Sequence, residues 1–343
     1  MRPRPLLPIP NLNPNWGNDA MEVPTLTVGT SPHWRTSTSI TGMNIAFIVA
    51  LCPAALVGAI AHSFGPNATA MTTATGPFAG VIETLVVEMG LNTGILWLAG
   101  IFGMIALGMA LGILTEYVCQ IVMRQPYHAA NGHGALVGFV MVLLMPPTVP
   151  LWVLAVGIVV AIFLGKQVFG GIGGYPMHPA IVGWLVLLLS WPNHLYPVGM
   201  ESIAAVHLAP ILATAAGGVA LLMLGYIRWQ IPVGVIGGVV VFSLVFQADL
   251  AIGDGQSFSI VDQLITGHVA LAAFFLATDP TSSPANKSAK LVYGFGTGFL
   301  IVLIRAYGIW PDAVPFAILL MNVMSPLLDR MRRRVKKVVI QNG

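Results

Sequence analysis

Long runs of apolar residues, separated by short polar stretches, follow one another along most of the chain. A helix that crosses a lipid bilayer needs about 20 consecutive apolar residues, and shorter apolar runs indicate interrupted helices. The pattern therefore predicts an all-α integral membrane protein with about ten transmembrane helices, some of them broken. The apolar runs lie at 41–61, 95–114, 134–145, 151–164, 180–191, 208–229, 231–250, 264–277, 289–307 and 314–328.

Two of the short runs resemble each other in sequence. Residues 132–136 read GHGAL and residues 267–271 read GHVAL. Each run stops at a proline-rich stretch, PPTVP at 146–150 and PTSSP at 280–284. Interrupted helices at matching places in two halves are typical of inverted repeats, and they mark the functional centre of such folds. We therefore expect two five-helix repeats of opposite orientation.

The two ends of the chain differ from its apolar middle. Residues 1–39 are proline-rich and polar, without an apolar run of signal-peptide length, and the last residues are strongly basic. The predicted organisation is a cytoplasmic arm at 1–39, a first repeat at 40–191, a second repeat at 192–329 and a basic cytoplasmic tail at 330–343.

The composition excludes a soluble enzyme. Hydrophobic residues make up 56% of the 343 residues and charged residues only 8%, whereas a soluble domain carries roughly 25% charge. The net charge of +3 is too small to predict a nucleic-acid partner. Only two cysteines occur, Cys52 and Cys119, each in an apolar run. We therefore expect neither a disulfide framework nor a metal site on this chain alone.

The basic residues orient the predicted helices, because lysine and arginine accumulate in the cytoplasmic loops of membrane proteins. Six of the 15 basic residues follow Leu328. With ten crossings the N-terminal arm lies on the same side, and the first four of the five loops on the other side contain no lysine or arginine. We therefore expect both termini to be cytoplasmic. Arg305, near the last outer loop, is the exception.

A glycine-rich turn between the fourth and fifth apolar runs is one candidate binding site. Gly170, Gly171, Gly173 and Gly174 permit positive φ angles and a close approach of backbone, cofactor or partner. Lys166 precedes them and could bind an anionic group, such as a flavin phosphate or a carboxylate of a partner. The alternatives are a structural turn and a lysine that extends to the cytoplasmic membrane surface.

Four further polar residues lie where a bilayer makes them costly. Asp279, at the end of the eighth run, could take a proton, coordinate a cation or contact a cofactor, or could only cap the turn. His133 and His268 are candidates for proton carriers or quinone contacts, with a hydrogen-bonding role at a helix end as the alternative. Arg305 lies well inside a predicted crossing, where it is either functional or extends outward to the surface.

Two long motifs resemble the RnfD/NqrB family. HGALVGFVMVLLMPPTVPLWVLAVGIVVAIFLGKQVFGGIGGYPMHPAIVGW, at 133–184, is similar to the centre of that family, with its PPT-x-P-x-W stop and its KQ-x-(F/Y)GG-x-G turn. FFLATDPTSSPANKSAKLVYG, at 274–294, resembles its second signature, ATDP-x-TSP followed by a lysine and (I/V)YG. SPHWRTSTSI, at 31–40, is similar to the family's segment before the first helix. The resemblance extends over residues 30–333.

The resemblance implies a ten-helix inverted-repeat fold akin to the urea channels, in the inner membrane of a bacterium. It implies the D subunit, or a close paralogue, of an Rnf-type complex that couples electron flow between ferredoxin and NAD or quinone to ion translocation. Such a chain is one component of a translocase, and its partners are other membrane subunits, iron–sulfur and flavin subunits and the lipid bilayer.

The resemblance also implies flavin cofactors, and here the sequence departs from the family. In that family, a covalent FMN is attached to a threonine of an (S/T)-x-A-T motif in the outer region after the fifth helix. The corresponding residues of this chain, 192–207, contain no threonine. The nearest candidate, Thr214, is predicted inside the sixth helix, with Ile211 in place of the motif's Ser or Thr. We therefore expect non-covalent FMN or riboflavin rather than covalent FMN. The alternative function is a stand-alone channel or transporter for a small solute or ion.

Overall fold

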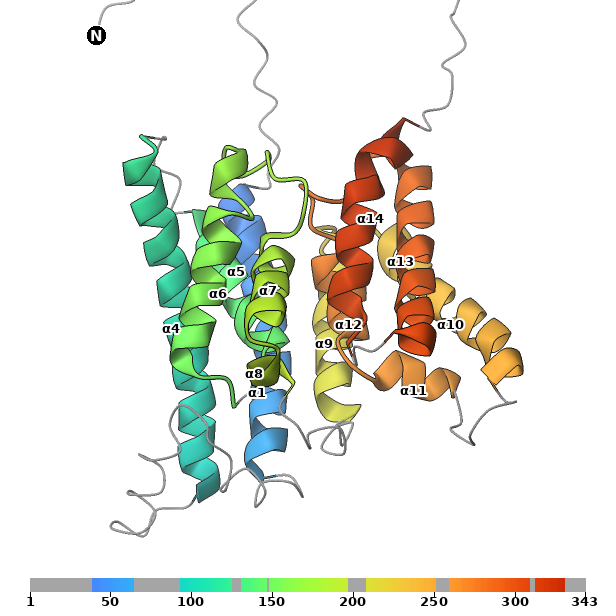
Figure 1. Cartoon of the computed structure of the whole chain (residues 1–343), viewed down its shortest axis with the longest axis horizontal. Coiled ribbons are helices and arrows are strands. Elements are labelled where there is room, and N and C mark those ends of the chain that lie inside the picture. The colour runs from blue at the N-terminus through green and yellow to red at the C-terminus, as the bar shows by residue number, and fades with distance from the viewer. Residues whose placement is uncertain are drawn as a thin grey trace, which may run out of the picture. The chain divides into compact units, whose positions relative to one another are not determined.

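The computed structural model describes residues 39–64, 93–124, 131–146, 148–196, 208–250, 259–308 and 312–330. These residues form helices, with short turns where the connections between them are described, so the predicted all-helical membrane fold is confirmed (Figure 1). The predicted arm and basic tail lie outside the described residues except for Ser39 and Arg330, and the repeat boundaries stay predictions.

The helices follow the predicted apolar runs closely. The first half contains α1 (Ile40–Phe64), α4 (Thr93–Val122), α5 (His133–Leu144), α6 (Leu151–Phe163), the 3₁₀ turn η2 (Gln167–Phe169), α7 (Pro179–Ser190) and α8 (Pro192–Leu195). The second half contains α9 (Leu208–Met223), α10 (Gln230–Leu250), α11 (Ile260–Ile265), α12 (Val269–Leu271), η4 (Ala272–Leu276), α13 (Lys287–Tyr307) and α14 (Val314–Asp329).

Four of these segments are long and apolar enough to cross a membrane, and five shorter apolar helices accompany them. The short helices include α5, whose apolar run was predicted to stop at the proline-rich stretch 146–150, and α7. The count of ten crossings stays a prediction. The four long segments are Ile40–Ala61, Leu98–Val122, Leu151–Phe169 and Lys287–Tyr307.

The eighth apolar run is more broken than its sequence predicts. Its residues divide into α11, α12 and η4, with a turn at Gly267, which has a φ of +64°. Element η4 is a π-helical turn, in which the Ala277 amide donates to the Ala272 carbonyl oxygen over 2.9 Å. Single π-helical turns frequently occur at functional sites. This one directly precedes Thr278 and Asp279.

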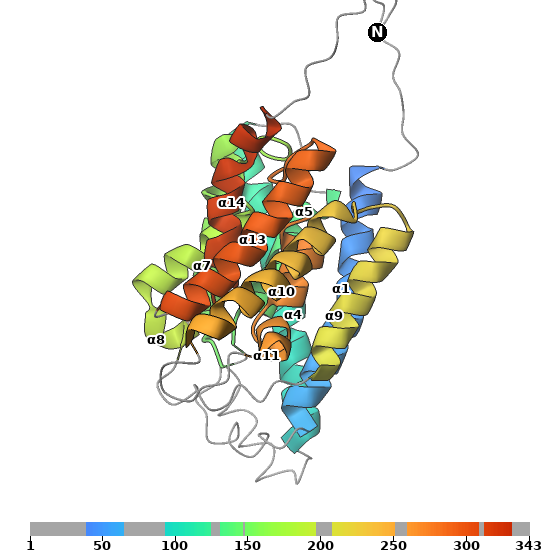
Figure 2. The ribbon, with the colours of Figure 1, turned by 90° about the vertical axis from the view of Figure 1, so that its right-hand side faces the viewer.

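The two halves pack against each other along helices that are far apart in sequence. Helix α1 lies beside α9 (Figure 2), and α7 lies beside α14, where the rings of Trp184 and Phe316 meet edge to face with centroids 5.5 Å apart. Both rings belong to an apolar core that is continuous through the described residues. The packing therefore holds the ends of the broken helices of one half against the other half.

Within the first half, small residues bring α4 and α5 into backbone contact. A Cβ atom added to Gly138 would lie 2.1 Å from the carbonyl oxygen of Gly108, so no side chain fits between the two helices there. Small residues at membrane helix interfaces allow this close approach. The contact brings the last turns of α4 to the first turn of α5, where the buried polar residues lie.

Candidate functional site

A chain of five hydrogen-bonded side chains lies inside the bundle; we call it the first polar chain. Lys166 Nζ donates to Glu116 Oε1 over 2.7 Å and lies 3.2 Å from His133 Nδ1. His133 Nε2 lies 3.0 Å from the Tyr175 hydroxyl, which donates to Asp279 Oδ1 over 3.1 Å. All five residues are buried, and the Lys166 and Glu116 residues are 0% and 1% exposed.

The donors and acceptors of this chain have only one consistent arrangement while Lys166 is charged. An ammonium group has donors and no acceptor, so His133 Nδ1 accepts and His133 carries its proton on Nε2. The Nε2–H group then donates to the Tyr175 oxygen, and the Tyr175 hydroxyl proton points to Asp279. Every hydrogen bond from Lys166 to Asp279 therefore runs in the same direction.

Lys166 does not extend to the membrane surface. Its ammonium is fully buried against Glu116 of the same chain, at the junction of α6 and η2. This placement contradicts the alternative of a surface-seeking lysine, while binding of a flavin phosphate or a partner's carboxylate stays a prediction. Burying an ion pair is costly unless further hydrogen bonds satisfy it, and His133 and Gln120 supply such bonds.

Asp279 caps its turn, as its position suggested, and also accepts a hydrogen bond from a residue far away in the sequence. Its Oδ2 atom accepts hydrogen bonds from the Ser282 amide at 3.1 Å and the Ser282 hydroxyl at 2.9 Å, which is the turn-capping role. Its Oδ1 atom accepts from Tyr175, 104 residues earlier in the chain. Asp279 therefore ends the first polar chain while it stabilises the turn that follows η4.

Backbone geometry explains most of the glycines in the turn at 170–174. Gly170, Gly171 and Gly173 have φ angles of 94°, 90° and 90°, which favour glycine. A Cβ atom on Gly170 or Gly173 would meet no described atom within 4 Å, whereas one on Gly174 would lie 2.3 Å from the Phe169 carbonyl oxygen. The close approach expected at this turn is therefore an approach between backbone atoms of the turn itself. The turn also positions Tyr175.

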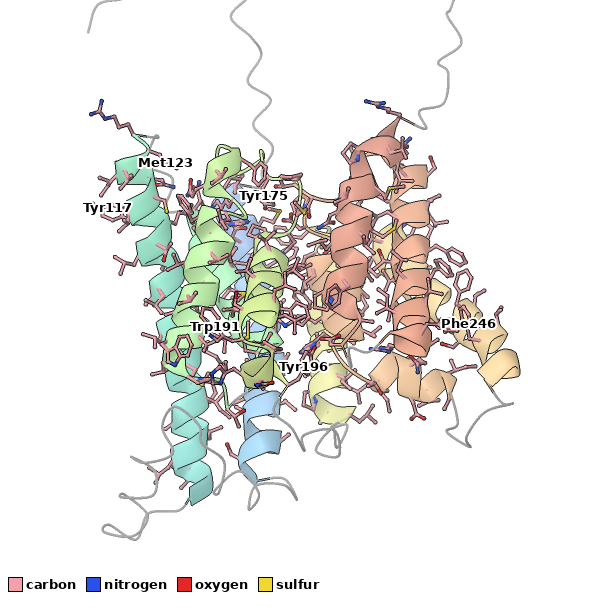
Figure 3. All side chains as sticks on the ribbon, in the orientation of Figure 1. Tyr117, Met123, Tyr175, Trp191, Tyr196 and Phe246 are labelled. Atoms are coloured by element: carbon pink, nitrogen blue, oxygen red, sulfur yellow. The ribbon has the colours of Figure 1, made fainter. Side chains whose placement is uncertain are left out.

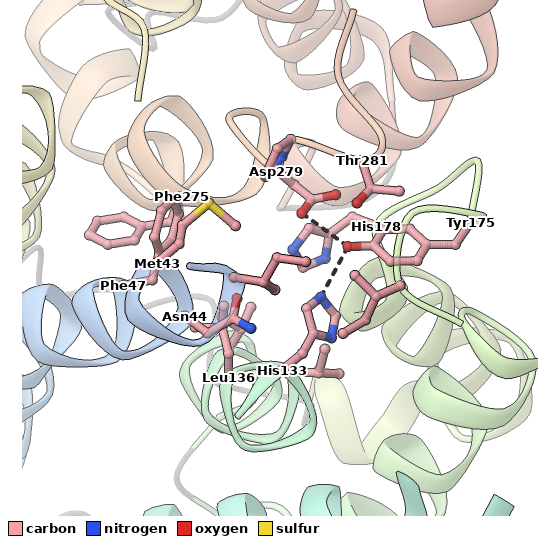
Figure 4. A pocket seen from close by; sticks show the side chains of 15 residues that line it. Met43, Asn44, Phe47, His133, Leu136, Tyr175, His178, Phe275, Asp279 and Thr281 are labelled. Atoms are coloured by element: carbon pink, nitrogen blue, oxygen red, sulfur yellow. Dashed lines mark hydrogen bonds between the residues drawn. The ribbon is translucent and has the colours of Figure 1, made fainter. Parts of the chain in front are cut away.

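A pocket opens beside the first polar chain (Figure 4). Phe47 of α1 and Phe275 of η4 form an edge-to-face pair on its apolar wall, with ring centroids 5.9 Å apart. His178 is buried, and its Nδ1 atom has no hydrogen-bond partner among the described residues. The pocket is lined by these residues together with Asn44, His133, Tyr175 and Asp279, among others.

The pKa values of two groups in the connection before α7 follow from their burial. Burial raises the pKa of the Tyr175 phenol well above its usual value, and the Asp279 carboxylate raises it further. Burial lowers the pKa of His178, and Asp279 opposes this shift only in part. At neutral pH, Tyr175 is therefore a phenol and His178 is uncharged.

His268 and Arg305 lie in a second cluster, together with Asp312. His268 Nδ1 lies 2.5 Å from Asp312 Oδ2. Arg305 donates from its two terminal nitrogens to the carbonyl oxygens of Gln263 at 2.6 Å and Thr266 at 2.7 Å. Arg305 thus holds the turn between α11 and α12 with a partly buried charge, which is a structural role.

The pKa shifts of His268 and Asp312 both favour the charged forms of the pair. Burial lowers the pKa of His268, but the Asp312 carboxylate outweighs this effect and the net shift is upward. Burial raises the pKa of Asp312, and His268 and Arg305 outweigh it to give a net lowering. The His268 side chain keeps 32% of its surface exposed, so water partly screens the pair.

The two clusters show that the broken helices run in opposite directions. The start of α5, at His133, meets the end of the η4 segment, at Asp279, through Tyr175. His268, at the start of α12, meets Asp312 at the start of α14 instead. Figure 3 shows Tyr175 toward one end of the bundle and Tyr196, which lies near Asp312, toward the other. This arrangement is the one that an inverted repeat predicts.

Sequence reasoning found His133, Asp279 and Lys166 but missed Glu116 and Tyr175. Glu116 was missed because the second apolar run was ended at residue 114, whereas α4 continues to Val122. A carboxylate inside a membrane helix is itself a signal of function. The weak candidate Thr214 lies within α9, where its hydroxyl donates to the Pro210 carbonyl oxygen over 2.7 Å.

Comparison with known proteins places the chain in a family. A model of the NQR2, RnfD, RnfE family matches residues 27–207 and 200–337. The chain belongs to this family. The match extends over both halves of the fold, including the two polar clusters.

Several curated relatives in the family are D subunits of ion-translocating complexes. The chain is 28% identical to the D subunit of the proton-translocating ferredoxin:NAD(+) oxidoreductase complex of Clostridium ljungdahlii, over 90% of this chain and 95% of the relative. It is 27% identical to the Na(+)-translocating counterpart of Acetobacterium woodii, over 89% and 93%. It is 32% identical to the D subunit of the ion-translocating oxidoreductase complex of Ectopseudomonas mendocina, over 57% and 72%.

Proposed function

We propose that this chain is the D subunit of an Rnf-type complex, in which electron transfer between ferredoxin and NAD or quinone is coupled to ion translocation. The family match supports the assembly, and the first polar chain supports the coupling. Other membrane subunits and iron–sulfur and flavin subunits are its partners. The distribution of lysine and arginine supports a position in the bacterial inner membrane with both termini in the cytoplasm.

The observation that carries the proposal is a buried, fully connected set of ionisable groups at the ends of two broken helices. Charged side chains inside a membrane are expensive and usually serve transport or proton transfer. Here Glu116, Lys166 and Asp279 are held within one hydrogen-bonded unit. The hydrogen bonds of this unit stabilise charged side chains at the ends of the broken helices, where backbone groups are left unpaired. In folds of this kind, the sites for coupling ions lie at such helix ends.

We further propose that the flavin of this chain, FMN or riboflavin, is bound without a covalent bond. The flavin would supply electron transfer. Thr214 is a poor attachment point, because its hydroxyl is bonded within a helix.

The test is purification of the affinity-tagged chain from its native membrane. We expect iron–sulfur and flavin subunits to co-purify, and vesicles containing the complex to take up ions when reduced ferredoxin and NAD are supplied. Acid precipitation should release the flavin, and should do so equally from a Thr214→Ala variant. A chain that purifies alone and conducts a small solute would instead establish the channel function. Flavin that stays on the precipitated chain would contradict non-covalent binding.

A further inference from the structure

The first polar chain connects helix α4 to the wall of the pocket without a gap. Its four successive contacts measure 2.7, 3.2, 3.0 and 3.1 Å. Proton transfer between side chains requires heavy atoms within about 2.6–3.2 Å of each other. Each contact along the chain meets this requirement, and burial of all its members keeps bulk water from competing.

We propose that the first polar chain is a proton-transfer path from Glu116 in α4 to Asp279 at the pocket wall. The proposal rests on the proposed function, because it states how a proton moves within this subunit of that complex. It goes further by assigning the path to named atoms of this chain. Asp279 is the delivery point, since it both ends the path and lines the pocket.

One transfer consists of three hops along the existing hydrogen bonds. Asp279 Oδ1 takes the hydroxyl proton of Tyr175, and the Tyr175 oxygen takes the Nε2 proton of His133. His133 then takes a proton at Nδ1 from Lys166. Lys166 becomes a neutral amine and Asp279 a carboxylic acid, while Tyr175 and His133 keep their proton numbers. The net charge of the chain is unchanged, because one ammonium and one carboxylate are neutralised together.

Glu116 reloads the path. A proton that reaches its carboxylate passes to the Lys166 amine through the 2.7 Å contact. The Glu116 Oε2 atom is buried and has no hydrogen-bond partner within the described part of the chain, so it is free to accept that proton. His133 and Tyr175 turn back to their first orientations after Asp279 gives its proton to a water molecule in the pocket that it lines.

The chemistry of each member suits transfer better than simple packing. An imidazole is the one neutral side chain that accepts a proton at one ring nitrogen while it gives one from the other. Tyr175 stays a phenol because its pKa is raised by burial and by Asp279, so it passes protons on. A purely structural link would need none of these properties, as the buried Tyr293–Asn322 hydrogen bond illustrates.

Variants of the complex in proteoliposomes test the path, with reduced ferredoxin and NAD as substrates. His133→Gln keeps an acceptor and a donor of similar reach but cannot exchange protons between them, and Tyr175→Phe removes the hydroxyl. Tyr293→Phe is the matched control, because it removes the hydroxyl of an equally buried tyrosine outside the path. Electron-transfer rate, its solvent isotope effect, ion uptake and the yield of assembled complex are measured together.

We expect both path variants to assemble with their cofactors and to lower the coupled rate by about 10²-fold, since positioned proton transfer contributes at least that much. The remaining rate should show a larger solvent isotope effect, and Tyr293→Phe should match the native complex. If Tyr175→Phe fails to assemble, His133→Gln decides alone. Normal coupled rates in His133→Gln, or a loss no larger than in Tyr293→Phe, would overturn the path. An inactive native complex would instead count against the proposed function.

Discussion

A methyl group added to Gly138 would force helices α4 and α5 apart. The new Cβ atom would lie 2.1 Å from the Gly108 carbonyl oxygen and 2.7 Å from its carbon. A carbon–oxygen contact needs about 3.3 Å, so the two backbones must separate by about 1 Å. Both atoms belong to rigid helix backbone, which cannot rotate away as a side chain can.

The expected cost follows from two opposing effects. Overpacking a close-packed interface costs up to about 3 kcal/mol, and replacing glycine by alanine inside a helix returns about 1 kcal/mol. We therefore expect Gly138→Ala to lower the free energy of unfolding by about 2 kcal/mol. The same substitution at Gly103 or Gly237, where a Cβ would meet no described atom within 4 Å, should cost nothing or stabilise.

Thermal and denaturant unfolding of the purified complex in detergent provides the measurement, with the three alanine variants prepared in parallel. The separation of α4 from α5 should also lengthen the path between Glu116 and His133, so that coupled electron transfer falls in Gly138→Ala alone. Equal stability of Gly138→Ala and the two control variants would show that the helices adjust without strain, and would refute the reasoning from backbone contact.

Two further predictions concern the charged pairs. Glu116→Gln should cost about 3–5 kcal/mol of stability, because it leaves the Lys166 ammonium buried without its counter-charge. Glu116→Leu combined with Lys166→Met should restore stability but not coupled electron transfer. A double variant as unstable as the single one would contradict this. The raised pKa of His268 means that its pairing with Asp312 stabilises fully below about pH 6.5 and is lost as pH rises through the raised value. The Tm difference between native and Asp312→Asn complexes should therefore shrink as the pH rises above about 6.5, and a constant difference would refute the pairing.

Most helix positions could be predicted from the sequence, because apolar length decides where a helix crosses a bilayer. The differences arise where tertiary contacts act. The sixth run was predicted to reach residue 229, but α9 ends at Met223 and Gly225 turns the chain with a φ of +78°. The eighth run was predicted as one interrupted segment, whereas it divides around Gly267 and continues as a π-helical turn.

The candidate site was only partly predictable, for a reason of distance along the chain. His133 and Asp279 were each recognisable as polar residues at the ends of broken helices. They are connected through Tyr175, which lies 42 positions after His133 and 104 positions before Asp279. No local sequence pattern can reveal contacts over such separations. Lys166 was misread for the same reason, since its counter-charge, Glu116, lies 50 residues earlier.

The two polar clusters share a plan but differ in their chemistry. In each, a histidine at the start of a broken helix accompanies a basic residue near the end of the following long helix: His133 with Lys166, and His268 with Arg305. A lysine amine can give up a proton and take one back, whereas an arginine guanidinium stays protonated in proteins. The first cluster can therefore carry a proton, while the second holds a fixed charge that anchors its turn. On the proposed path, lysine in the first cluster and arginine in the second distinguish the end that transfers protons from the end that holds a fixed charge.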